Sequence, residues 1–154
     1  MNKILIFLMI FLLVACASER KTKLKSQREH WEYSSWNSKF KDRAICLCVL
    51  YGQNNASLIE KISNNDRSFR DPLSQAIFDS VILTNLKKVI VTINTDSIYR
   101  IGRVAEALKG KHIFSTCLRF YKSKTLDSIT RNQKRYWKSI KDIDTIIKKK
   151  VPDF

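Results

Sequence analysis

The side chains in this sequence best suited to covalent chemistry are four cysteines and two histidines: Cys16, Cys46, Cys48, Cys117, His30 and His112. A pair such as Cys48 with His112 would suit a thiol nucleophile and its base. No spacing supports that pair, and the ligand spacing of a metal site is also missing. The paired-histidine helix, the glycine-rich phosphate loop and the serine elbow are absent as well. We therefore expect no enzyme activity and no cofactor, with a small thiol hydrolase as the enzymatic alternative.

Cys16 ends the longest apolar run of the chain. Residues 4–15 hold 12 apolar side chains and no charge, and Lys3 stands just before them. A membrane-spanning helix needs roughly 20 apolar residues, so this run fits a secretory signal better. Leu13-Val14-Ala15-Cys16 resembles the bacterial lipobox, in which the cysteine is lipidated and the chain is cut before it. The alternative is a buried helix that ends in a core cysteine.

This resemblance predicts a signal peptide at residues 1–15 and a lipid on Cys16. The mature protein would then lie on the periplasmic side of the cell envelope. In an enteric-type Gram-negative host, Ala17, rather than aspartate, after the cysteine indicates the outer membrane, by resemblance to known lipoproteins. Disulfides are permitted in that oxidising compartment.

The chain is strongly basic, with 29 lysines and arginines against 14 acidic residues and a net charge of +15. Loss of residues 1–15 removes only the charge of Lys3. Nucleic acid is not the expected partner of an exported protein. The charge therefore indicates either anionic envelope material or an acidic protein partner.

Residues 16–30 are expected to form a disordered basic tether, because Leu24 is the only large apolar residue between Ala17 and His30. Such a tether can lie near an anionic membrane surface or serve as a plain spacer. A single domain of residues 31–154 follows.

The domain is predicted to be an all-α, compact bundle of five or six helices. "AICLCVLY" at 44–51 is apolar throughout, and the lack of a partner strand favours a helix. Asp71-Pro72 is typical of a helix start. The run 89–93 fits either a strand or a helix end. Further helices are expected from residues 94–96 to Gly110, over 113–121, after Ser123 or Thr125, and as one stripe from Tyr136 to Ile147.

Three cysteines remain if Cys16 is lipidated, which allows one disulfide and one free thiol. Cys46 and Cys48 are two positions apart, so on a helix their side chains point about 200° apart. Only one of them can face Cys117, and periodicity does not say which.

Two stretches resemble the type VI secretion amidase immunity proteins of the Tai family, group four. The first is "FKDRAICLCVLYG", and the second is "STCLRFYKSKTLDSI". The family pattern, an aromatic with a Cys and a Tyr and then Cys-x-x-x-Tyr-x-Ser-x-x-Leu, matches Phe40, Cys46, Tyr51, Cys117, Tyr121, Ser123 and Leu126. The resemblance spans about residues 36–131.

The resemblance implies an all-α periplasmic protein without enzyme activity, often a homodimer, that binds and blocks a peptidoglycan amidase toxin. It further implies a disulfide between Cys46 and Cys117. The family has an inhibitory loop just before the second motif, and the matching residues here are Lys109, Gly110, Lys111 and His112. A structural or peptidoglycan-contacting envelope lipoprotein is the alternative.

Overall fold

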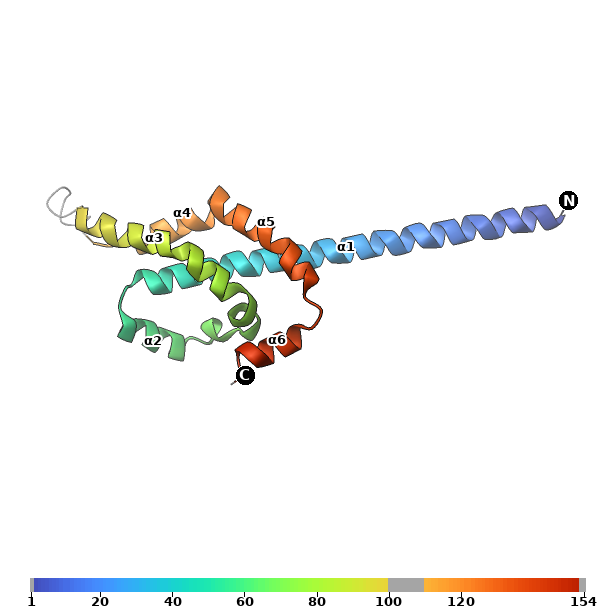
Figure 1. Ribbon diagram of the computed structural model, residues 1–154. Helices are drawn as coiled ribbons and strands as arrows, with labels where there is room; N and C mark the ends of the chain where they lie inside the picture. The colour runs from blue at the N-terminus through green and yellow to red at the C-terminus, as the bar shows by residue number, and fades with distance from the viewer. Residues whose placement is uncertain (1, 100–109, 153–154) are drawn as a thin grey trace. The chain divides into compact units, whose positions relative to one another are not determined.

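The computed structural model describes residues 2–99 and 110–152, and this part of the chain contains six α-helices and no strand (Figure 1). The predicted all-α fold and the predicted helix number are confirmed. The chain divides into two compact units, Met1–Trp36 and Asn37–Phe154.

Helix α1 spans Asn2–Gly52 and includes residues 16–30, the predicted disordered tether. The structure therefore contradicts the expected disorder of that segment. No glycine or proline occurs before Gly52, and the segment is rich in lysine, arginine, glutamate and glutamine, which are good helix formers. A shortage of apolar residues leaves this segment little to bury, but it does not lower the helix propensity. Within the described residues, no helix combines the length and the apolarity needed to cross a membrane.

The C-terminal part of α1 supplies one wall of the core of the second unit. Phe40, Ala44, Leu47 and Cys48 are buried and recur at helical spacing, so the helical interpretation of residues 44–51 is confirmed. The helix ends at Gly52, where a Cβ atom would lie 2.7 Å from Cγ2 of Ile113. A glycine at this position therefore lets the start of α4 approach the end of α1.

Helix α2 (Ala56–Asn65) and the short helix η1 (Arg67–Arg70) follow. Both begin at a side-chain cap, because Asn55 accepts a hydrogen bond from the amide of Leu58 and Asp66 accepts one from the amide of Ser68. Neither element contains a buried residue, so this segment adds little to the core.

The helix predicted from Asp71-Pro72 is present. Asp71 accepts a hydrogen bond from the amide of Ser74, and the chain continues through the π-helical turn η2 (Ser74–Phe78) into α3 (Asp79–Tyr99). The run 89–93 is therefore helical. The new helix start expected at residues 94–96 is wrong, because α3 passes through these residues without a break. The remainder of that expected helix, residues 100–109, lies outside the described residues.

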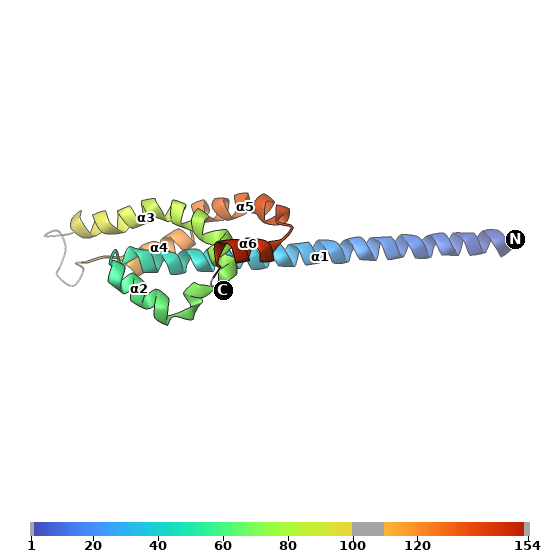
Figure 2. The same ribbon diagram turned by 60° about the horizontal axis from the view of Figure 1, so that its bottom comes forward.

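Three helices complete the second unit: α4 (Ile113–Tyr121), α5 (Lys124–Ser139) and α6 (Ile143–Lys150). Helix α4 lies beside the C-terminal part of α1 (Figure 2), where Ile113 approaches Gly52. The single stripe expected from Tyr136 to Ile147 is two helices, because Ile140 has an extended backbone and Asp142 caps α6 through the amide of Thr145.

An aromatic cluster of Phe40, Phe78 and Trp137 joins α1, η2 and α5, with ring centroids 5.4–5.7 Å apart. Beside it, Arg43 donates two hydrogen bonds to the carboxylate of Asp79, at 2.8 and 2.7 Å. Burial disfavours the charge of Arg43, but the hydrogen bonds and the negative charge of Asp79 outweigh it, and the pKa of Arg43 is raised. These contacts fix α1 against the start of α3.

Candidate functional site

The two helices that carry the family resemblance are joined by a disulfide between Cys48 and Cys117. The Cα atoms of these residues are 5.7 Å apart, within the normal range for such a bond. The pairing of Cys46 with Cys117 that the resemblance implies is therefore wrong. Cys48 shares the buried face of α1 with Ala44 and Leu47, whereas Cys46 lies on the opposite, exposed side of the helix.

The bond also bears on the pair of Cys48 and His112 considered as a thiol nucleophile and its base. The sulfur of Cys48 is bonded to that of Cys117, so Cys48 has no thiolate to pair with His112. Cys46 is the free thiol of the second unit, and desolvation raises the pKa of that thiol although Arg43 opposes the effect. A thiol with a raised pKa is a poor nucleophile at neutral pH. Among the described residues, no group of histidine, cysteine and carboxylate side chains could hold a metal ion.

The other residues of the resemblance stabilise the fold. Phe40 lies in the aromatic cluster, and Leu126 is almost fully buried. Ser123 caps α5 by accepting a hydrogen bond from the amide of Leu126, at 3.1 Å. The hydroxyl of Tyr121 donates to Asp42 at 3.3 Å, which connects α4 to α1. Tyr51 is half-buried near the end of α1.

A lysine reinforces this connection between helices. The ammonium of Lys41 lies 4.9 Å from the centre of the Tyr121 ring and 2.9 Å from the carboxylate of Asp127 on α5. The hydrogen bond and the positive charge of Lys41 lower the pKa of Asp127. The residues of the two motifs thus connect α1, α4 and α5, and we call these three helices the frame.

The predicted toxin-binding loop directly precedes α4, one of the three helices of this frame. Lys109 lies outside the described residues. Gly110 is exposed, has a φ of +114°, and has no atom within 4 Å of the position that a Cβ would take. A positive φ favours glycine because it has no side chain, whatever the space around it.

The side chain of Lys111 is held by a hydrogen bond. Its ammonium donates a hydrogen bond to the carbonyl of Gln53, at 2.9 Å, just beyond the end of α1. His112 is half-buried, and its carbonyl accepts hydrogen bonds from the amide of Thr116 and the hydroxyl of Ser115. Hydrogen bonds therefore hold Lys111 to the end of α1 and His112 to the first turn of α4.

Phe114 is the candidate contact residue that the sequence pattern misses. It falls in the apolar stripe of residues 113–121, which favours an inward position, but its side chain is 66% exposed. Helix α4 has only nine residues, and its buried face is set by Cys117 and Phe120. Phe114 is displaced from that face, so a large aromatic ring is exposed to solvent two residues after His112 in the chain.

No protein-family model, no curated protein and no solved structure matches this chain at a significant level.

Proposed function

We propose that this chain is an immunity protein that binds and occludes the active site of a peptidoglycan amidase toxin delivered by type VI secretion. It acts without enzyme activity, on the periplasmic side of the envelope, as an outer-membrane lipoprotein anchored through Cys16 and as a homodimer. The resemblance of residues 36–131 to the Tai family is the starting point of this proposal.

One structural observation carries the proposal. Phe114, on the first turn of α4, has an exposed ring and closely follows Gly110, Lys111 and His112 in the chain, and the Cys48–Cys117 disulfide fixes that helix to α1. Strong contacts in protein interfaces are enriched in aromatic residues, and a rigid base lowers the entropy lost on binding. An exposed aromatic side chain on a rigid base is suited to enter an enzyme cleft.

The charge of the chain supports the same proposal. A net charge of +15 for the full sequence, or +14 after loss of residues 1–15 with Lys3, accelerates association with an acidic partner, which matters for a protein that must intercept an incoming toxin. The exposed backbone at Gly110 and the side chain of Lys111 supply hydrogen-bond donors at the contact.

The proposal is tested first by whether an amidase gene lies next to the gene of this chain, and then with the amidase that such a gene encodes. The purified full-length protein, in detergent, is mixed with that amidase, and hydrolysis of purified peptidoglycan is measured. We expect stoichiometric inhibition and a stable complex. An uninhibited amidase, or binding of the chain to peptidoglycan alone, would support the structural lipoprotein instead.

A pair of matched variants locates the contact. Phe114→Ala is expected to weaken binding of the amidase by about 2 kcal/mol or more, the range of interface hot spots. Val91→Ala truncates a side chain that is 59% exposed on α3, outside the segment 110–114, and is expected to change binding little. Equal effects of the two variants would place the contact elsewhere.

The combined change of Lys109, Lys111 and His112 to alanine is expected to weaken binding by about 2–4 kcal/mol.

A further inference from the structure

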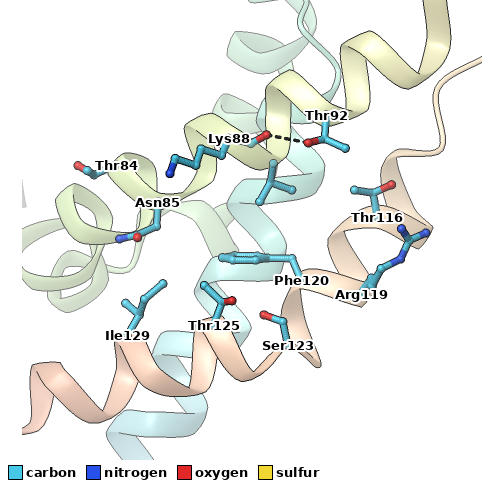
Figure 3. Close-up of a pocket in the computed structure, with 11 residues that line it drawn as sticks. Thr84, Asn85, Lys88, Thr92, Thr116, Arg119, Phe120, Ser123, Thr125 and Ile129 are labelled. Atoms are coloured by element: carbon cyan, nitrogen blue, oxygen red, sulfur yellow. Dashed lines mark hydrogen bonds between the residues drawn. The ribbon is translucent and has the colours of Figure 1, made fainter. Parts of the chain in front are cut away.

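A second surface of the same unit is hollowed between three helices. Helices α3, α4 and α5 enclose a groove of about 430 Å³, which we call the α3–α4–α5 groove (Figure 3). Its volume lies in the range of natural ligand sites. Of the segment 110–114, no described residue lines it, so it is distinct from the proposed toxin contact.

The floor of this groove is apolar. Phe120 projects into it from α4, between α3 on one side and α5 on the other (Figure 3). Val89 of α3 and Ile129 of α5 contribute the remaining aliphatic surface, and both are half-buried. Exposure of this apolar floor to water is unfavourable, so an apolar group that covers the floor is stabilised there.

The rim of the groove is cationic. Lys88 of α3 and Arg119 of α4 are both exposed and line it, and no described lining residue is acidic. Within the described residues, neither cation forms an ion pair. Two positive charges without a counter-charge favour a ligand that carries carboxylates.

The hydroxyl groups of the groove fall into two sets. Thr84 and Thr92 donate to backbone carbonyls of their own helix, at 2.8 and 3.0 Å, and are therefore occupied. The hydroxyls of Thr116 and Thr125 have no hydrogen-bond partner among the described residues. Ser123 accepts the capping bond from Leu126, and its own hydroxyl proton remains available. The groove thus offers neutral donors near the cations.

We propose that the α3–α4–α5 groove binds a short acidic segment of a partner protein, with carboxylates at Lys88 and Arg119 and an apolar side chain on Phe120. A free inorganic anion would satisfy the cations but leave the floor wet. A peptide covers the floor as well, and its carbonyl groups can accept hydrogen bonds from Thr116 and Thr125.

The test uses the full chain in a nonionic detergent and two pools of short fluorescent peptides. In the first pool, Asp or Glu alternates with Leu, Val or Phe. In the second, Asn or Gln replaces the acidic residues. Fluorescence anisotropy is expected to show saturable binding of the acidic pool only, and inorganic sulfate at equal charge is expected to compete poorly.

A charge-matched pair of variants assigns the binding to the groove. Lys88→Gln with Arg119→Gln is expected to weaken binding of the acidic pool by about tenfold or more, because it removes both charge-assisted contacts. Lys87→Gln with Lys122→Gln lowers the net charge equally at exposed positions outside the groove, and is expected to change binding less than about twofold. Thermal unfolding of both variants verifies that they fold, since all four positions are exposed.

Four results would overturn the proposal. They are no saturable binding of the acidic pool, equal binding of the neutral pool, equal weakening by the two double variants, and complete competition by sulfate, which would mean that the groove is an anion site only. Binding to vesicles of anionic lipid that depends on Lys88 and Arg119, without binding of the acidic peptides, would assign the groove to a membrane surface instead.

Discussion

Phe40 and Phe114 are phenylalanines on helices of the same unit, and their surroundings are opposite. Phe40 is 1% exposed and contacts Phe78 and Trp137, whereas Phe114 is 66% exposed at the first turn of α4. The region around Phe40 is closed by aromatic packing and by the Arg43–Asp79 ion pair. The region around Phe114 leaves its largest side chain in solvent, so the first region determines stability and the second is suited to recognition.

The largest expected effect separates these two regions directly. Phe40→Ala should lower the free energy of unfolding by about 3–5 kcal/mol, because it removes a buried ring and leaves a cavity. Phe114→Ala should change that free energy by less than about 0.5 kcal/mol. Urea unfolding followed by circular dichroism measures both. Similar losses for the two variants would contradict the contrast.

The disulfide gives the next largest effect. Cys48→Ala opens the link across 69 residues and should lower the free energy of unfolding by roughly 4 kcal/mol in the chain-entropy model. Cys46→Ala is the matched control, since Cys46 is free and exposed, and it should be nearly neutral. Peptide mapping without reductant tests the pairing itself. A Cys46–Cys117 peptide would restore the pairing that the family resemblance implies.

The cap of α5 gives a smaller effect. Ser123→Ala removes the acceptor for the amide of Leu126 and should lower the free energy of unfolding by about 1 kcal/mol. Ser128→Ala, at an exposed position within α5, should be neutral or slightly stabilising. If Ser123→Ala lowers the free energy of unfolding no more than Ser128→Ala does, packing alone holds α5.

The smallest expected effect is a dependence of stability on pH through Asp127. Lys41 lowers the pKa of Asp127, so this carboxylate stabilises the folded protein above its unfolded-state pKa. That contribution should decline as the pH falls below the usual aspartate pKa and should vanish below the lowered, folded-state pKa. Asp127→Asn should therefore reduce stability at neutral pH but not in strong acid. A difference between the proteins that persists unchanged in acid would exclude this origin.

The helical fold could be predicted from the sequence because caps and apolar stripes are local signals. The pattern indicates Asp71 as a helix start and Ser123 as one of two possible starts with Thr125, and both Asp71 and Ser123 cap their helices in the structure. The extent of α3 was not predictable in the same way. Asn94, Thr95 and Asp96 look like a cap, but continuous packing of residues such as Ile93 keeps the helix intact.

The choice between Cys46 and Cys48 shows how far the candidate site could be predicted from the sequence. Spacing established that only one could face Cys117, and the family resemblance indicated the wrong one. The register of α1 decides it, since Phe40, Ala44 and Cys48 share one face. The exposure of Phe114 was hidden for a related reason, because an apolar stripe does not reveal which of its members a short helix leaves uncovered.

The long separation between Cys48 and Cys117 also has a consequence during synthesis. The buried face of α1 leaves the ribosome 69 residues before Cys117 does. At about 5–20 residues per second, α1 waits roughly 3–14 seconds for this partner. During that interval Phe40, Ala44 and Leu47 have no α4 or α5 to cover them. The nascent chain therefore presents an uncovered apolar helix to chaperones and to the export machinery until its last third has been made.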